Sequence, residues 1–450
     1  MKKYFCIVFL SFFFSCKKFV DIGSSPLQVE TEKIFADEQA ATSAMMGLYG
    51  QLNSGILISF NGAFTLYPAL SADEMYITGS NANAEQFFSN LLLSTNSVVQ
   101  TSFWTTIYKY IYHANAVLEG LKNSANLTED FKQKLGAEAR VMRALCYFYL
   151  VNVFGDTPLI LYTDYQQSMV MPRIGKSEVY NAMKDDLVYA KMFLPIGYQS
   201  PGRARPNKYT AAALLARIYL YMGSWSEAET EADFVIASGS YPLLSDLNQV
   251  FLIGSGETIW SIARDNANTG EGAGFIPASS SVKPPYAFTD TLLKSFEISD
   301  KRKLNWMKAN VVAGTSYYYP FKYKSRTQTP ITESIVVLRS AEQYLIRAEA
   351  RLRLGKNDSA RVDINRIRTR AGLPALATVN TDSLNKALEK ERQTELFAEW
   401  GHRWFDLKRT NRAIVHLPAL KPFFQSNAQL FPIPYNELQR NVYLEQNPGY

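Results

Sequence analysis

Apolar residues recur at every third or fourth position over most of the chain, which is the period of amphipathic helices. Residues 103–118 show this spacing, and residues 137–150 show it again before the helix-breaking sequence Gly155-Asp156-Thr157-Pro158. Alternation with a period of two is clearest at residues 257–262, where it predicts a strand. The pattern therefore predicts a mainly α fold that carries a few short strands.

One helix–turn–helix spacing occurs twice. Its positions are Tyr219, Gly223, Trp225, Ala228 and Ala232 in the first copy and Arg351, Gly355, Asn357, Ala360 and Ile364 in the second. In each copy the glycine suits the end of one helix, and the alanines let the next helix approach closely. Helix pairs that repeat in this way are the unit of tetratricopeptide arrays. We therefore predict a scaffold of tetratricopeptide-like helix pairs.

Two stretches, residues 53–100 and 241–338, break the helical rhythm. Within the first, residues 61–96 are polar with scattered aromatic side chains, and they predict a long irregular loop of the kind that often carries binding residues. The second predicts an irregular subdomain, and its Gly270-x-Gly272-x-Gly274 lacks the spacing of a phosphate-binding loop. The expected organisation is an N-terminal helical region at 16–240, a ligand-facing irregular subdomain at 241–338 and a C-terminal helical region at 339–450.

The first sixteen residues have the pattern of an export signal. Lys2-Lys3 precede an apolar run at residues 4–14, which is too short to span a bilayer, so residues 1–15 are expected to be a signal peptide. The following Ser15-Cys16 resembles a bacterial lipobox, and this resemblance implies cleavage before Cys16 and lipidation of its sulfur. Phe13 in place of the usual leucine, and Lys17-Lys18 after the cysteine, leave an ordinary signal peptide as the alternative.

Composition excludes several classes of protein. Of 450 residues, 47% are hydrophobic and 20% are charged, as in ordinary globular proteins, and the length allows two or three domains or one repeat-built unit. The net charge of +6 comes without any Lys/Arg run longer than three residues, so no nucleic-acid partner is expected. After loss of Cys6 and lipidation of Cys16, Cys146 would have no cysteine to pair with.

Residues 384–409 place charge within an apolar sequence. Glu391, Glu395 and Glu399 continue the helical stripe begun by two leucines, and three such glutamates repel one another unless cations lie against them. The nearby cations are Arg392, Arg403, Lys408 and Arg409. We predict a buried ion network across a helix break at Gly401, made of Glu391, Arg392, Glu395, Glu399, Arg403, Asp406 and Arg409.

A catalytic role for His402 as a general base is the alternative to that structural network. The chain has three histidines, and none lies at metal-ligand spacing from another, so neither a metal nor a cofactor is expected. The sequence contains no G-x-S-x-G, H-E-x-x-H or Walker motif. Asp73 and Glu74 are the best candidates for a carboxylate pair that hydrolyses glycosides.

The stretch 391–409 resembles the signature ERxxELxxEGHRWFDLKR of the SusD/RagB family, nutrient-binding lipoproteins of Bacteroidetes outer membranes, with Trp400 as an extra residue. Residues 137–158 and the terminal LFPIPxxE and QNPGY segments are similar to other motifs of the family, although Asn441-Val442-Tyr443 lacks a usual proline. The resemblance implies a lipid-anchored protein on the exterior of the outer membrane. It would bind an oligosaccharide or polysaccharide, dock on a SusC-like TonB-dependent barrel and catalyse no reaction.

Aromatic side chains outside the regular helices are the best ligand candidates, because a flat ring buries the apolar face of a sugar. The candidate ligand-binding residues are Tyr67, Asp73, Tyr76, Tyr286, Trp306, Tyr317 and Tyr318. Two alternatives remain open at this point. One is a peptide ligand, as in the RagB branch, and the other is an exported glycosidase on a helical scaffold.

Overall fold

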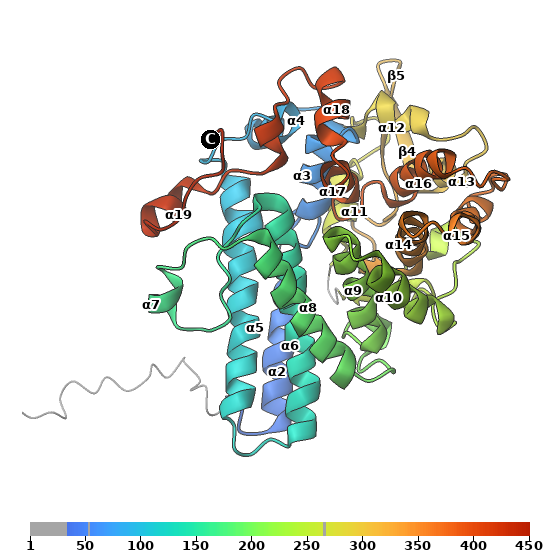
Figure 1. Cartoon of the computed structure of the whole chain (residues 1–450). Helices are drawn as coiled ribbons and strands as arrows, with labels where there is room; N and C mark the ends of the chain where they lie inside the picture. Colours follow the sequence, from blue (N-terminus) through green and yellow to red (C-terminus); the bar gives the residue numbers. More distant parts are fainter. Residues whose placement is uncertain (1–33, 53–54, 264–266) are drawn as a thin grey trace, which may run out of the picture.

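The computed structural model describes residues 34–52, 55–263 and 267–450. The predicted signal peptide and Cys16 lie outside these residues. Figure 1 shows a mainly helical molecule in which long helices pack side by side, with the strands β4 and β5 at the upper right. The predicted mainly α fold with helix pairs is confirmed. Within the described residues, no helix is long and apolar enough to cross a membrane.

The first group of helices forms one side of the molecule (Figure 1). It comprises α2 (Glu38–Leu52), α5 (Thr106–Asn123), α6 (Glu129–Phe154) and α8 (Lys176–Phe193), with a π-helical turn at Val99–Thr105 before α5. Thr128 caps α6, because its side chain accepts the Phe131 N–H at 3.3 Å. The second half of α6 is buried on all sides, which explains why its sequence is almost wholly apolar.

Two helix hairpins form the tetratricopeptide-like part of the frame. They are α9 (Lys208–Met222) with α10 (Trp225–Ala237), and α14 (Ser340–Arg353) with α15 (Asn357–Arg370). Gly223 and Gly355 make the two turns with positive φ angles of 77° and 74°, a region of backbone conformation that favours glycine. A buried ion pair joins the hairpins, with Arg217 Nε 2.6 Å from Glu342 Oε1.

Two further helices follow, of which α16 (Thr381–Leu396) packs onto the second hairpin and α17 (His402–Arg409) packs against α16. Gly401 lies between them with a φ angle of 72°, at the break that the sequence indicated. The remaining short helices are α7 (Tyr165–Ser168), α11 (Gly270–Phe275), α12 (Asp290–Ser295), α13 (Lys301–Trp306), α18 (Ala413–His416) and α19 (Tyr435–Arg440).

The prediction of a long irregular loop at residues 61–96 is wrong. The segment contains α3 (Ala63–Ser71), the strand β1 (Met75–Ile77) and α4 (Ala82–Ser89). Every residue of α3 is buried, so this helix has no polar face and its sequence lacks the helical period. The side chain of Asn81 caps α4 by accepting the Ala84 N–H at 3.1 Å.

The middle of the chain contributes three two-stranded antiparallel sheets. Strand β2 (Thr258–Ile262), which the sequence predicted, pairs with β6 (Ile335–Arg339); β1 pairs with β3 (Tyr286–Phe288), and β4 (Met307–Val312) pairs with β5 (Thr315–Pro320). The glycines of α11 serve close packing, because a Cβ atom at Gly270 or Gly272 would collide with the backbone oxygens of Asn61 or Ser325.

Candidate functional site

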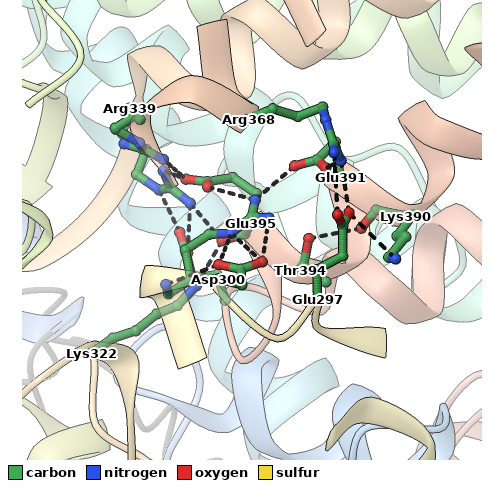
Figure 2. A network of polar contacts seen from close by, with 12 residues as sticks. Glu297, Asp300, Lys322, Arg339, Arg368, Lys390, Glu391, Thr394 and Glu395 are labelled. Carbon is green, nitrogen blue, oxygen red and sulfur yellow. Dashed lines mark hydrogen bonds and ion pairs between the residues drawn. The ribbon is translucent and has the colours of Figure 1, made fainter. Parts of the chain in front are cut away.

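A buried ion network holds the irregular subdomain against the helical frame. At its centre Arg339, at the end of β6, contacts two glutamates of the α16 region, with Nη1 2.6 Å from Glu395 Oε1 and Nη2 2.8 Å from Glu399 Oε1 (Figure 2). Arg370 of α15 also pairs with Glu395, and Lys322, which follows β5, pairs with Glu399. All five side chains are almost inaccessible to solvent.

The same network extends along α16 to Glu391. Arg302 of α13 lies 2.9 Å from Glu391 Oε2 and also donates from Nε and Nη2 to the Asp300 carboxylate, and Arg368 of α15 lies 2.8 Å from Glu391 Oε1 (Figure 2). Burial alone would raise the pKa of Glu395, but the guanidinium groups of Arg370, Arg339 and Arg302 hold it well below its usual range. The carboxylate stripe is therefore compensated by cations that come from four other segments.

A second set of ion pairs connects α17 to its neighbours. Arg392 makes two hydrogen bonds with Asp406, at 2.7 and 3.0 Å, and Asp406 also accepts the Arg409 Nε–H at 2.8 Å. Arg409 in turn pairs with Glu349 of α14 at 2.5 Å. The structure thus places all seven residues predicted for the ion network in ion pairs that are buried or nearly so.

The expectation that Arg403 compensates the buried glutamates of the stripe is wrong, because its contact on α16 is the partly exposed Glu389, with Nη1 3.6 Å from Oε1. Arg403 instead makes a bidentate ion pair with Asp73, at the end of α3, with both N–O distances 2.8 Å. His416 Nε2 lies 2.8 Å from the same carboxylate. Burial would raise the pKa of Asp73, but hydrogen bonds from Arg403 and His416 hold it well below its usual range.

Neither His402 nor the Asp73–Glu74 pair has the surroundings of a catalytic group. His402 is buried, and burial lowers its pKa to about 4, so the ring is neutral at pH 7. Glu74 is also buried, and burial together with the charge of Asp73 raises its pKa to about 8. Asp73 is engaged by Arg403, so the two adjacent acids do not present carboxylates to an open cleft.

Two of the predicted tyrosines come together where two of the small sheets meet. Tyr76 of β1 pairs across the ladder with Ala287 of β3, and β3 contacts β5, which carries Tyr317. The pKa of Tyr76 is raised by its partial burial and by the neighbouring Tyr317 and Asp290. We call the surface formed by Tyr76 and Tyr317 the aromatic face.

The β4–β5 hairpin positions Tyr317 on this face. Ala313 and Gly314 at the tip both have positive φ angles, 49° and 78°, as a type I′ turn requires. The Asn310 amide donates to the carbonyl oxygens of Ser279 and Val282, both at 2.8 Å, and so fixes the segment before β3 against the hairpin. That segment carries Lys283, whose Nζ lies 5.2 Å from the centre of the Tyr317 ring.

The other five predicted ligand residues lie elsewhere. Tyr286 is buried, and it pairs with Ile77 on the side of the β1–β3 ladder opposite Tyr76. The rings of Tyr67 and Trp306 are buried, since Tyr67 packs 4.6 Å from the Phe87 ring and Trp306 is fully covered. Asp73 is buried in its ion pair, as described above. Tyr318 is half-buried, but it follows Tyr317 along β5 and so points to the opposite face of the hairpin. Tyr67, Asp73 and Trp306 therefore have no surface to offer a ligand.

Sequence reasoning missed Lys283 and Asn310. Neither residue belongs to a motif, and their roles depend on the packing of the 279–283 segment against β4 and β5. The resulting face offers one half-buried tyrosine from each of two strands, a cation and an amide-anchored loop. This combination can stack on an apolar ring face and hydrogen-bond hydroxyl groups.

Two family models match the chain. The model described as the SusD family matches residues 299–450, and the model described as starch-binding associating with outer membrane matches residues 28–220. The chain is also 26% identical to the SusD-like protein P25 of Formosa agariphila over 98% of both chains.

Solved structures with the same fold cover nearly the whole chain. A SusD superfamily protein from Bacteroides vulgatus superposes with a TM-score of 0.82 at 21% identity, covering 92% of this chain and 99% of that chain. A laminarin-binding SusD-like protein superposes with a TM-score of 0.76 at 24% identity, covering 92% and 100%.

Proposed function

The chain belongs to the SusD family, and from that premise we propose that it captures an oligosaccharide at the outer surface of the cell and delivers it for uptake. The observation that carries this proposal is the aromatic face, where Tyr76 and Tyr317 lie beside Lys283 on a subdomain fixed by buried ion pairs. A rigid frame lowers the entropic cost of holding these rings for a ligand. The laminarin-binding relative supports a glycan as the ligand class.

The proposed mechanism is binding and transfer without bond chemistry. The candidate carboxylate pair supports this view, because Asp73 and Glu74 are both buried and Asp73 is held by Arg403. By family resemblance, the receiving partner is a SusC-like TonB-dependent barrel. The paired helices α9–α10 and α14–α15 would give such a partner an extended, stiff surface.

Attachment to the outer membrane through a lipid on Cys16 completes the proposal. The Ser15-Cys16 sequence and the description of the matched family model, starch-binding associating with outer membrane, both support it. Mass spectrometry of the protein extracted from membranes tests the anchor directly. A diacylglyceryl modification at Cys16 is expected, and an unmodified mature chain released from cells would contradict it.

The ligand class is tested with the lipid-free protein on a glycan array, followed by calorimetry with the strongest oligosaccharide. Saturable binding that leaves the oligosaccharide intact after long incubation is expected. Cleaved product would identify a glycosidase and overturn the proposed mechanism. Binding to extended peptides with no response to any glycan would overturn the ligand class and favour a peptide carrier.

A further inference from the structure

A second hollow lies far from the aromatic face, between α5, the loop that contains α7, and α19. It has a volume of about 320 Å³, within the range typical of small-molecule sites. Figure 1 shows α7 and α19 at one side of the molecule, whereas β4 and β5 lie at the opposite side. Neither the ion network nor the aromatic face uses this hollow, which we call the α5–α19 groove.

The floor of the groove is rigid and aromatic. The Trp104 ring lies 5.0 Å from the rings of both Tyr108 and Phe154, and it is almost fully buried. The Tyr108 hydroxyl lies 2.6 Å from Thr157 Oγ1 and donates to the Pro158 carbonyl at 2.9 Å. The floor is therefore formed before any ligand arrives, which reduces the entropic cost of binding.

The loop over the groove is fixed by hydrogen bonds at two points. The Asn115 amide donates to the carbonyl oxygens of Ile160 and Tyr162, at 3.0 and 3.2 Å. At the other end of the loop, the Asn441 amide donates to the Met171 carbonyl at 2.8 Å. These bonds hold the loop against α5 on one side and against the end of α19 on the other.

Two tyrosines form an open rim above this floor. The Tyr112 side chain of α5 is 50% exposed and that of Tyr165 in α7 is 66% exposed, so neither ring is needed for packing. A polar wall faces them. There Glu437 Oε1 accepts the Gln100 amide at 2.7 Å, and the exposed Arg440 lies 3.2 Å from the same oxygen. The groove thus combines flat apolar rings with a carboxylate and a guanidinium.

We propose that the α5–α19 groove is a second carbohydrate-binding site that takes one sugar ring or chain end of the glycan captured by the protein. Tyrosine rims suit the C–H face of a pyranose, and Glu437 with Arg440 suits its hydroxyl edge. A purely apolar ligand would bury those two charges without hydroxyl partners. Helices and a loop line the groove, so an extended peptide would find no strand edge there.

This inference depends on the proposed function. Two double variants distinguish failure of the inference from failure of the proposed function. The array oligosaccharide with the strongest signal is titrated into the parent, Tyr112→Ala/Tyr165→Ala and Tyr76→Ala/Tyr317→Ala. The parent is expected to bind two ligands per chain, and each double variant is expected to lose one of them. Leu161→Ala is the matched control, because Leu161 is exposed on the same loop but does not line the groove, and it should keep both.

Three outcomes would overturn the inference. If Tyr112→Ala/Tyr165→Ala binds like the parent while Tyr76→Ala/Tyr317→Ala binds nothing, the groove is no sugar site and the proposed function stands. If Leu161→Ala loses the same ligand as the groove variant, the effect comes from the loop and the inference fails. A parent that binds no glycan on the array overturns the proposed function and the inference together. Thermal melting of each variant verifies that it is folded.

Discussion

Arg403 and Asp73 form a buried bidentate ion pair that joins α17 to the end of α3, three residues before Tyr76. Asp73 is fully buried and its other side-chain hydrogen-bond partner is His416, so removing Arg403 would leave the carboxylate largely uncompensated. Arg403→Ala is expected to lower the free energy of unfolding by about 3–5 kcal/mol in urea denaturation. Arg440→Ala, an exposed arginine, should change it by less than about 0.5 kcal/mol. Equal denaturation midpoints for parent and Arg403→Ala would contradict this role.

Glu74 makes stability depend on pH. Burial and the neighbouring Asp73 raise its pKa to about 8, whereas a glutamate in the unfolded chain titrates near about 4.3. Between these two values the folded protein keeps a proton that the unfolded chain releases, so this residue lowers the free energy of unfolding as pH rises. Glu74→Gln removes the effect.

The Glu74→Gln variant should therefore be stabilised relative to the parent, by about 1 kcal/mol at pH 5 and by about 4–5 kcal/mol at pH 8.5. Urea denaturation of both proteins at pH 5, 6.5 and 8.5 measures the difference. Comparing the two proteins cancels the contributions of all other titrating groups that the substitution leaves unchanged. A difference that stays constant over this range would show that the buried carboxyl is ionised throughout.

Successive residues of β5 give a matched test of the aromatic face. Tyr317 and Tyr318 are both half-buried, but they point to opposite faces of the hairpin, and Tyr317 is the one beside Tyr76. Tyr317→Ala is expected to weaken oligosaccharide binding about tenfold, whereas Tyr318→Ala should leave the affinity close to that of the parent. Calorimetry measures both constants. Equal losses in the two variants would mean that the hairpin as a whole, and not one face, determines binding.

The sequence could predict that the acidic stripe is buried, because a helical period puts Glu391, Glu395 and Glu399 on one face with leucines. In the structure α16 ends at Leu396, and Glu399 lies in the turn that follows it. The sequence could not predict the partners of these glutamates. Arg302, Arg339 and Arg370 lie in α13, at the end of β6 and in α15, and no local pattern marks them as the cations of this site. Only the tertiary packing brings these segments to α16.

Helix α3 is an element that the sequence pattern did not reveal. A helix that is buried all round has no polar stripe, so the period that revealed α5 and α6 is absent from residues 63–71. The packing of α3, and the pairing of the strand that follows it, determine which tyrosines are exposed to a ligand. Tyr67 points into the core toward Phe87, and Tyr76, nine positions later, reaches the surface because β1 pairs with β3. The aromatic residues were visible in the sequence, but their exposure was not.

The buried pair Arg217–Glu342 links the two helix hairpins, and substitutions at these positions test whether the pair itself stabilises the fold. Both side chains are almost inaccessible, and two contacts of 2.6 Å connect them. Removing one partner strands the other charge, so Arg217→Met alone is expected to cost about 3–5 kcal/mol of unfolding free energy. Replacing both, as Arg217→Met/Glu342→Leu, removes both desolvation costs and should restore stability to within about 1–2 kcal/mol of the parent. Urea denaturation of the two variants gives the comparison. A double variant no more stable than Arg217→Met would mean that the pair's own attraction, and not relief of a stranded charge, holds the hairpins together.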